Sequence, residues 1–385
     1  MPPNPRTGLT GLEQRVLKRF RALEHPRDRE LFVGFSGGLD SLALAGVLSR
    51  IVKFTGQQTV LVHVDHGLRP GSRAEAHTAG ASALALNSRF IHTVLKVKCT
   101  VLHPHVGLEE AARRERYAAF ARVVGSGGTI ALAHHQSDQA ETVLLHLLRG
   151  AGLRGAAGMA EWTQIVVPWW SESEECSRVR FNLWRPFLGE TRDLVRAYGR
   201  NLGLEAVHDP TNDEPTQTRT SLRLEIIPVL ELIQPGASAA LARYGELAAI
   251  DDAYLENMTA KYAHKVFHHS GSLRTNELRE LPEAIALRVI REWLALRHPD
   301  LTVSSDRTRA ILSLALRRAK GRVVQIGSDL GVAIVGECLW VASAGALLKV
   351  ANAENPASDS ERSGDLGVAI ESLGVDIDDL TAPGE

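Results

Sequence analysis

The chain has 385 residues, of which 44% are hydrophobic and 23% are charged. This length allows two or three domains, and this composition excludes bulk disorder, a collagen-like repeat and a coiled coil. The 44 Lys and Arg residues nearly balance the 45 Asp and Glu residues, so the net charge of −1 taken by itself argues against a nucleic-acid partner.

The near-zero total charge hides two regions of opposite sign. Residues 351–385 hold nine Asp or Glu and one basic residue, so this segment carries −8 and the rest of the chain +7. Residues 272–322 hold eleven Arg or Lys against six acids, a surplus that suits a phosphate backbone. The charge pattern is therefore compatible with RNA, and residues 351–385 are expected to form an acidic, largely disordered tail.

Cysteine usage and hydropathy indicate the compartment. The cysteines at 99, 176 and 338 form no Cys-x-x-Cys pair, which favours a reducing compartment without a structural zinc site. The first ten residues are polar and proline-rich, unlike a signal peptide. The longest apolar stretch, residues 331–350, contains Glu337 and several glycines and predicts two short strands instead of a membrane span. We expect a cytoplasmic protein without a membrane partner.

An opening amphipathic helix is predicted over residues 11–23. Four buried strands are then predicted at 31–35, 59–64, 90–97 and 129–133, with helices between them at 42–48, 75–86 and 108–124. Strands that alternate with helices predict an α/β fold with a doubly wound, mostly parallel sheet. Ligands of such sheets bind beyond the carboxyl ends of the strands, where polar clusters occur here at residues 36–41, 65–66 and 134–141.

The pattern changes to helices alone after about residue 220. Helices are predicted at 222–232, 239–267, 283–298 and 305–318, and short strands between 323 and 341. We therefore expect a first domain over residues 1–220, a smaller helical domain with short terminal strands over 221–350, and the tail over 351–385.

The segment Ser36-Gly37-Gly38-Leu39-Asp40-Ser41 is a glycine turn between a strand and a helix. Glycines let the backbone approach a ligand closely, and successive N–H groups at a helix N-terminus suit a pyrophosphate. The two serines add hydroxyl donors, and Asp40 has the oxygen ligands that Mg²⁺ prefers. The chain has no Gly-Lys pair, which excludes a Walker A loop. A surface turn with a helix cap is the plainer alternative.

A second glycine pattern, Gly150-Ala151-Gly152-Leu153-Arg154-Gly155, matches the dinucleotide fingerprint by letter only. It follows a predicted helix and not a strand, so it favours a helix cap and loop over an NAD site.

The first glycine turn resembles the PP-loop of N-type ATP pyrophosphatases. Four further segments extend the resemblance to the tRNA(Ile)-lysidine synthetase family, over roughly residues 31–340. They are Val64-Asp65-His66-Gly67-Leu68-Arg69, the helix 109–117 with Ala112-Arg113 and Arg116-Tyr117, His134-His135-Gln136-Ser137-Asp138-Gln139-Ala140-Glu141-Thr142, and Asp209-Pro210-Thr211-Asn212 with Arg219 and Arg223 downstream.

The resemblance implies a reaction and its partners. Members of the family use ATP and Mg²⁺ to adenylate C2 of the cytidine at the first anticodon position of a tRNA(Ile) with a CAU anticodon. The ε-amine of free L-lysine then displaces AMP and leaves lysidine, which changes codon reading from AUG to AUA. The resemblance leaves the oligomeric state open.

The same resemblance assigns roles to residues of this chain. Asp40 and Asp138 are expected to be catalytic and to flank one Mg²⁺ ion. Glu141 is expected to accept from the exocyclic amine of cytosine, and Arg113 and Arg116 to clamp phosphate oxygens, with a solvated basic face as the alternative for Arg116. The expected ATP-binding residues are Ser36, Gly37, Gly38, Leu39, Asp40, Ser41, Asp65, His66 and Arg113, and the expected cytidine- or tRNA-binding residues are Glu141, Arg116, Arg219 and Arg223.

Two departures from the family pattern bear on these roles. Ser137 stands where the family usually has the first of two Asp residues, and Thr220 stands where it usually has Asn after Arg219. We assign the metal-binding role to Asp138, which keeps its spacing to Glu141.

Three other interpretations of the sequence concern a zinc site, a different enzyme of the same superfamily and a protein without catalytic activity. The histidines at 63, 66, 134 and 135 are expected to be hydrogen-bonded site and core residues and not zinc ligands. A tRNA cytidine 2-thiolation enzyme of the same superfamily is an alternative, but such enzymes need a reactive cysteine pair. A catalytically silent RNA-binding homologue is the other alternative, and the retained glycine turn, Asp138 and Glu141 argue against it.

Overall fold

The computed structural model describes residues 8–23, 30–65, 72–94, 99–103, 106–168, 178–207, 218–299, 301 and 303–353. The chain divides into two compact units, Met1–Ala249 and Ile250–Glu385. The division falls within helix α11 (Ala237–Val266), later than the boundary expected near residue 220. The helical residues just after 218 belong to the first unit because Arg219 and Arg223 bind Glu141 there.

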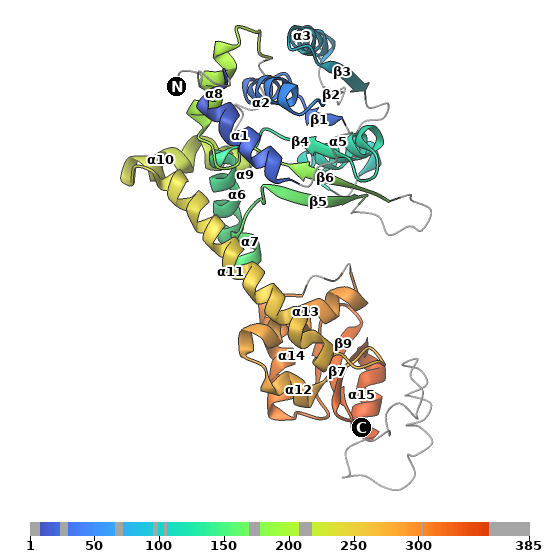
Figure 1. The fold of residues 1–385 in the computed structure, drawn as a ribbon. Helices are drawn as coiled ribbons and strands as arrows, with labels where there is room; N and C mark the ends of the chain where they lie inside the picture. Colours follow the sequence, from blue (N-terminus) through green and yellow to red (C-terminus); the bar gives the residue numbers. More distant parts are fainter. Residues whose placement is uncertain are drawn as a thin grey trace. The chain divides into compact units, whose positions relative to one another are not determined.

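A six-stranded, mostly parallel sheet forms the centre of the first unit in its described residues, in the order β3-β2-β1-β4-β6-β5 (Figure 1). Leu31 of β1 pairs with Thr59 of β2 and Thr129 of β4, so the central strands are parallel and in register. The predicted α/β class is confirmed. The strands are β1 (Leu31–Gly34), β2 (Thr59–Asp65), β3 (Arg89–Val94), β4 (Thr129–Ala131), β5 (Trp162–Val167) and β6 (Val179–Trp184).

The strand β5, at one edge of the sheet, and its neighbour β6 are not among the strands predicted from the sequence. They are antiparallel to each other, with Trp162 opposite Trp184, and β6 is parallel to β4. The helix α6 (Gln136–Leu148) and the single-turn α7 (Leu153–Ala156) precede β5, but no helix lies between β5 and β6 in the described residues. The alternation of helix and strand that reveals a doubly wound sheet therefore gives no signal for this pair.

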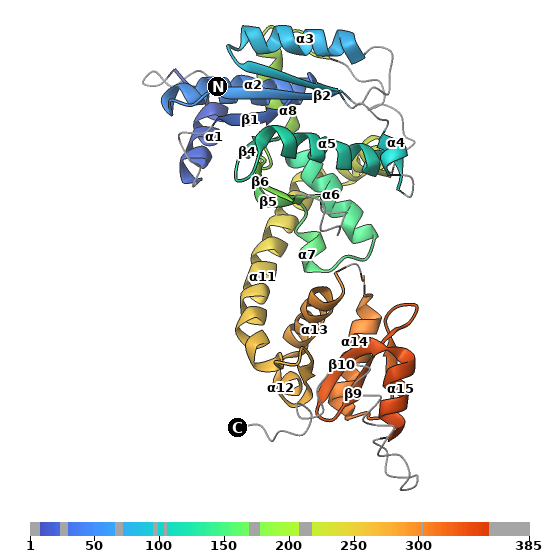
Figure 2. The ribbon, with the colours of Figure 1, turned by 90° about the vertical axis from the view of Figure 1, so that its right-hand side faces the viewer.

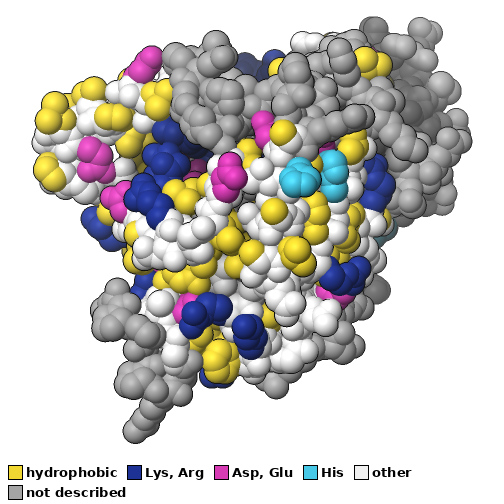
Figure 3. Space-filling view, turned by 90° about the horizontal axis from the view of Figure 1, so that it is seen from above, with side chains coloured by type: hydrophobic (Ala, Val, Ile, Leu, Met, Phe, Trp, Pro, Cys, Tyr) yellow, Lys and Arg dark blue, Asp and Glu magenta, His cyan; other side chains and the backbone are white. Residues whose placement is uncertain are grey.

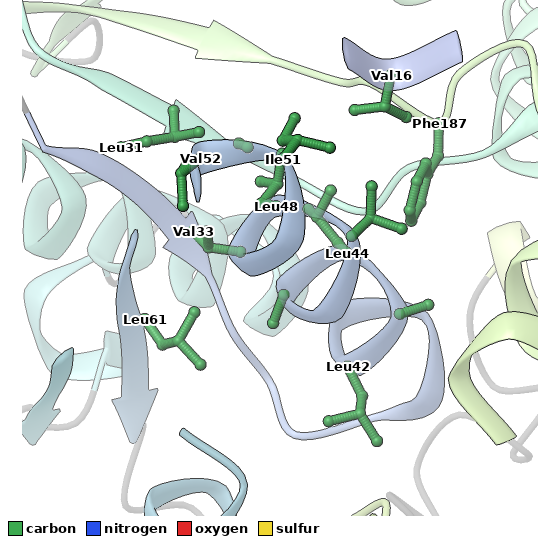
Figure 4. Packing of buried hydrophobic residues seen from close by; sticks show 14 of the residues in the cluster. Val16, Leu31, Val33, Leu42, Leu44, Leu48, Ile51, Val52, Leu61 and Phe187 are labelled. Carbon is green, nitrogen blue, oxygen red and sulfur yellow. The ribbon is translucent and has the colours of Figure 1, made fainter. Parts of the chain in front are cut away.

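Helices cover both faces of this sheet and bury a separate core on each. On one face α2 (Leu39–Ile51) lays Leu44 and Leu48 over Leu31 and Leu61 of the strands (Figure 4). On the other face, α5 (Leu108–Val124) packs against Ile130 and its neighbours. The remaining helices of the unit are α1 (Gly11–Ala22), η1 (Val52–Phe54), α3 (Ser72–Ala85), α4 (Cys99–Leu102), α6 (Gln136–Leu148), α8 (Arg192–Asn201), α9 (Thr218–Ser221), the π-helical η3 (Leu222–Ile226) and α10 (Ile227–Ile233).

The second unit has its own core and its own antiparallel sheet, in the order β7-β10-β9-β8. The strands β9 and β10 of this sheet are labelled in Figure 2. Its core includes Val289, Trp293 and Ile311. Its sheet contains strands in the region where the sequence predicts short terminal strands. The elements are β7 (Leu273–Arg274), α12 (Thr275–Glu280), α13 (Glu283–Arg297), α14 (Ser305–Arg317), β8 (Val323–Gln325), β9 (Leu330–Val335), β10 (Cys338–Ser343) and α15 (Ala344–Ala353).

The sequence predicts a disordered tail from residue 351 and no membrane span. Helix α15 continues to Ala353, so the start of the expected tail is helical, and residues 354–385 lie outside the described part of the chain. Within the described residues no single helix has the length and hydropathy to cross a membrane, although the bent pair Thr218–Ile233 and Ala237–Val266 meets those two criteria together.

Candidate active site

The glycine turn of residues 36–38 joins β1 to α2 at the carboxyl end of β1, as predicted. Gly38 is the N-cap of α2 and has no side-chain cap, so the first amides of the helix face outward without an internal side-chain acceptor. The hydroxyl of Ser41 donates to the Gly38 carbonyl at 2.8 Å and lies 3.2 Å from Ser36 Oγ. Both hydroxyls thus lie next to the amides that suit a phosphate.

Gly37 can be only glycine here, for two reasons. Its φ of +84° is a left-handed conformation that side chains rarely adopt. A Cβ at this position would also lie 2.7 Å from Val207 Cγ2, while the Val207 amide donates to the Gly37 carbonyl at 2.9 Å. The turn is therefore pinned by the segment that follows α8.

Asp40 lies in the first turn of α2 and faces positive groups. Arg196 Nε donates to Asp40 Oδ1 at 3.2 Å, and His135 Nε2 lies 3.8 Å from Asp40 Oδ2. Burial opposes ionisation of this carboxyl, but the hydrogen bond and charge of His135 and the charge of Arg196 outweigh it and hold the pKa of Asp40 below its ordinary value. The carboxylate is thus ionised at neutral pH.

Asp138 lies on the other side of the same histidine. The His135 amide donates to Asp138 Oδ2 at 2.9 Å, and His135 Nδ1 lies 3.2 Å from the same oxygen. Burial works against ionisation of Asp138 too, yet the nearby His135 and His134 hold its pKa below the ordinary value. The two aspartates predicted to be catalytic therefore converge from α2 and α6 on one imidazole.

Glu141 follows one helical turn after Asp138 and is almost fully buried. Arg223 grips it with two hydrogen bonds, Nε to Oε1 at 2.7 Å and Nη2 to Oε2 at 2.8 Å, and Arg219 Nε donates to Oε2 at 3.2 Å. The Glu141 bond raises the pKa of Arg223. Both carboxylate oxygens, expected to face cytosine, are thus engaged by arginines in this structure.

His134 and Arg185 each bury a nitrogen that has no hydrogen-bond partner among the described residues. They are Nδ1 of His134 and Nε of Arg185. Burial lowers the pKa of His134 to about 3, so its ring is neutral. Arg113, on α5, stacks 4.8 Å from the Tyr117 ring centroid and contributes to the positive field at His134.

Asp65 is buried at the carboxyl end of β2, where His92 Nε2 lies 3.8 Å from its Oδ2. His63 hydrogen-bonds the Phe35 carbonyl through Nδ1 at 2.9 Å. The His92 contact links β3 to β2, and the His63 contact links β2 to the residue that follows β1 and precedes the glycine turn. Within the described residues no group of three or more metal-ligating side chains gathers, and His66 lies outside them.

Not every predicted residue joins the cluster. Arg116 is exposed on α5, whereas Arg113 is partly covered, so the two arginines differ in environment. Thr220, the departure from the family pattern, is buried beside Arg219. The segment Asp209-Pro210-Thr211-Asn212 lies outside the described residues. The glycine run 150–155 follows helix α6, which confirms that it lacks the strand a dinucleotide site requires.

The structure adds two site residues that the sequence prediction missed, Arg192 and Arg196 of α8, and it shows that His135, expected as a site or core histidine, lies between the two aspartates. A sequence signal for α8 existed, since Thr191 precedes two arginines four residues apart at the start of a helix. Seen from above, Lys and Arg side chains gather beside Asp and Glu side chains on the described surface (Figure 3).

A strand–glycine turn–helix with outward amides, at the carboxyl end of a parallel strand, is a phosphate-binding arrangement typical of nucleotide-binding proteins. Residues 11–230 match the PP-loop domain family, which covers the first unit almost completely. The protein thus belongs by fold and site to the nucleotide-binding PP-loop class.

Comparison with curated proteins narrows the class. A tRNA(Ile)-lysidine synthase of Mycobacterium leprae is 37% identical over 75% of this chain and 82% of that protein, and one of Nocardia farcinica is 37% identical over 79% and 87%. One of Pseudomonas syringae is 35% identical over 70% of this chain and 59% of that longer protein. The chain belongs to the tRNA(Ile)-lysidine synthase family, which confirms the resemblance seen in its motifs.

A solved structure, the U34-tRNA thiolase NcsA of Methanococcus maripaludis with its [4Fe-4S] cluster, aligns with 62% of this chain and 78% of that one. The sequence identity is 16% and the TM-score 0.45.

Proposed function

We propose that the first unit adenylates C2 of the wobble cytidine of a tRNA(Ile) with a CAU anticodon, and that free L-lysine then displaces AMP to give lysidine. The C2 oxygen attacks the α-phosphorus, the bond from that phosphorus to the bridging oxygen breaks, and pyrophosphate leaves. The lysine ε-amine then bonds to C2, loses a proton, and expels AMP. The observation that carries the proposal is the convergence of Asp40 and Asp138 on His135 beside the glycine turn.

ATP fits the glycine turn. The outward amides after Gly38 and the hydroxyl of Ser36 are donors for phosphate oxygens, and the Ser41 hydroxyl would turn to phosphate from the Gly38 carbonyl to which it donates in this structure. We propose that Asp65, at the end of the neighbouring strand, and Arg113 help to hold the nucleotide, as the resemblance implies. His66 belongs to the same expected set.

Mg²⁺ fits the two aspartates by their chemistry. Mg²⁺ in phosphoryl-transfer sites is usually held by one or two carboxylates plus substrate phosphates and not by an all-protein cage. Asp40 and Asp138 are both kept ionised and both lie near the glycine turn, so they would hold the ion. When bound, Mg²⁺ neutralises charge on the triphosphate during attack at the α-phosphorus.

Glu141 with its arginines would orient the tRNA side of the reaction. Arg219 and Arg223 neutralise its carboxylate and fix helix α6 against α9 and η3. We propose that contact with the cytidine amine requires one arginine to release an oxygen of Glu141 and turn to a phosphate of the tRNA. The Glu141 carboxylate would then accept a hydrogen bond from cytosine, next to two guanidinium groups that can bind phosphate.

The second unit would bind tRNA. Its residues 272–322 have the basic surplus, and Arg288, Arg291 and Arg309 lie close enough to influence one another's charge. Burial and the positive charges of Arg288 and Arg309 lower the pKa of Arg291, while Arg288 itself pairs with Asp252 at 2.6 Å and Glu256 at 3.4 Å. Phosphates of RNA would balance the remaining basic surplus. We propose a cytoplasmic location, in keeping with a tRNA substrate.

The thiolation alternative is not favoured, because the three cysteines at 99, 176 and 338 are far apart in the sequence. The proposed reaction is tested with purified protein, ATP, Mg²⁺, labelled lysine and a transcript of tRNA(Ile) with the CAU anticodon. Label should enter this tRNA and should not enter a methionine tRNA with the same anticodon. Absence of lysine transfer would exclude the proposal.

A further inference from the structure

Helix α8 is fixed tightly beside the glycine turn. A Cβ at Gly199 would lie 2.8 Å from the Leu39 carbonyl oxygen at the start of α2. One at Gly46 of α2 would lie 2.7 Å from Leu202, just past the end of α8. The two helices therefore touch at two glycines, and the side chains of α8 that face α2 have defined positions relative to the turn.

Arg196 projects from α8 to the first turn of α2. Its Nε donates to Asp40 Oδ1 at 3.2 Å, and about a third of its side chain is exposed. Asp40 is also the residue expected to face the phosphates and their metal ion. An arginine at this carboxylate is thus already within the phosphate site, and only one of its five N–H donors is engaged in that bond.

Arg192, one turn before Arg196, lacks such a partner. Its Nε is buried and has no hydrogen-bond partner among the described residues. Burial and the charge of Arg196 lower the pKa of Arg192, while Asp40 and Asp138 raise it and Arg223 lowers it further. Arg192 therefore lies among the charged groups of the site and not on a remote surface.

The position of Arg192 in its helix is also unfavourable without an anion. It is the first residue of α8, after the N-cap Thr191, where the helix macrodipole disfavours a cation. A buried, unpartnered guanidinium nitrogen carries a further cost. An anion that binds between Arg192 and Arg196 would remove both costs.

We infer that Arg192 and Arg196 bind the β- and γ-phosphates of ATP and hold the pyrophosphate as it leaves. This inference rests on the proposed adenylation and adds two residues to it. Guanidinium forks match phosphate oxygens in pairs, and α8 presents two of them four residues apart near Asp40. Arg196 would turn from Asp40 to phosphate when nucleotide binds.

The inference is tested by direct binding of pyrophosphate with Mg²⁺ to the full chain, measured by calorimetry, with AMP as the second ligand. Arg192→Gln and Arg196→Gln should each raise the Kd for pyrophosphate about tenfold or more, because each removes a charged hydrogen-bond partner. The Kd for AMP, which lacks both outer phosphates, should change less than about twofold. Arg200→Gln, a change of the same kind at an exposed position of α8, should leave both constants unchanged.

The other possible source of phosphate is the tRNA backbone. If Arg192→Gln weakens binding of the anticodon stem-loop and leaves pyrophosphate binding intact, the inference is wrong. Equal loss of pyrophosphate and AMP affinity would also overturn it, since that result indicates general damage to the site. These measurements need no turnover, so failure of lysine transfer in the wild-type protein would overturn the proposed reaction and not the phosphate assignment.

Discussion

Glu141 accepts hydrogen bonds from two arginines, Arg219 and Arg223. Replacing it therefore tests how much this group of charges contributes to the free energy of unfolding. Glu141→Gln removes the charge but keeps the shape, so Arg219 loses the carboxylate it pairs with and Arg223 keeps only the weaker contact with Asp138 at 3.5 Å. Breaking a buried pair from one side costs about 3–5 kcal/mol, and partial exposure of the arginines places the expected loss near about 2–3 kcal/mol. The measurement is the free energy of unfolding in urea.

Glu110→Gln is the matched control for Glu141. Glu110 pairs with Arg114 on the surface of α5, four residues away on the same helix. Such a pair contributes about 0.3–0.5 kcal/mol, so the variant should remain close to wild type. Equal losses in the two variants would show that the arginine clamp on Glu141 has no special role in stability.

His134 gives the site a pH dependence with a defined sign. Its pKa is about 3 in the folded protein and is near 6.5 in an unfolded chain. Between these values the unfolded chain binds more protons, so the free energy of unfolding should fall as the pH drops below 6.5. At pH 5 the loss that comes from His134 should be about 1–2 kcal/mol, and His134→Asn should remove this part, whereas His63, whose pKa burial also lowers, contributes separately in the same window.

The measurement compares urea unfolding at pH 7 and pH 5. Asp40 and Asp138 have lowered pKa values, so their contribution is lost only below about pH 4 and does not enter this window. His77→Asn, at an exposed position of α3, should keep the wild-type difference between the two pH values. If His134→Asn kept the whole wild-type difference in the free energy of unfolding between pH 7 and pH 5, the lowered pKa of His134 would be contradicted.

At the scale of elements, the glycine turn depends on one backbone conformation. Gly37→Ala forces a side chain into a left-handed position and against Val207. Strain of this kind costs about 1–3 kcal/mol and should move the amides that bind phosphate. We expect the Kd for ATP to rise about tenfold or more, measured by calorimetry, while the far-ultraviolet circular dichroism stays unchanged.

Gly152→Ala serves as the control for Gly37→Ala. Gly152 belongs to the second glycine run, its φ is −74°, and a Cβ there would meet no atom within 4 Å. The variant should bind ATP like the wild type. Loss of ATP affinity in Gly152→Ala would indicate that the second glycine run contributes to nucleotide binding.

The elements also show which features a sequence can reveal. The glycine turn and α6 were predictable because each combines a strict spacing with a distinctive composition. The role of α8 was not, because the closeness of Arg196 to Asp40 depends on helix contacts at Gly46 and Gly199 that join residues far apart in the chain. The antiparallel pair of β5 and β6 escaped prediction because no helix separates the two strands in the described residues, so the alternation of helix and strand stops there.

At the scale of the whole molecule, the sequence pattern changes near residue 220, whereas the two compact units meet within α11, at Ala249 and Ile250. The change from mixed to helical patterning after residue 220 marks where α9 begins. Yet α9 and η3 belong with the first unit, because their arginines complete the site around Glu141. Composition detects a change of structure, whereas a unit boundary depends on which side chains bind one another.

The central claim is that Asp40 and Asp138 support adenylation of the tRNA base in a chain that has Ser137 in place of an aspartate. It is tested most directly with ATP labelled at the α-phosphate, tRNA(Ile) and no lysine. Wild-type protein should transfer label to the tRNA, added lysine should release it as AMP, and Asp138→Ala should transfer none. Wild-type protein that leaves the tRNA unlabelled, or Asp138→Ala that labels it normally, would contradict the account.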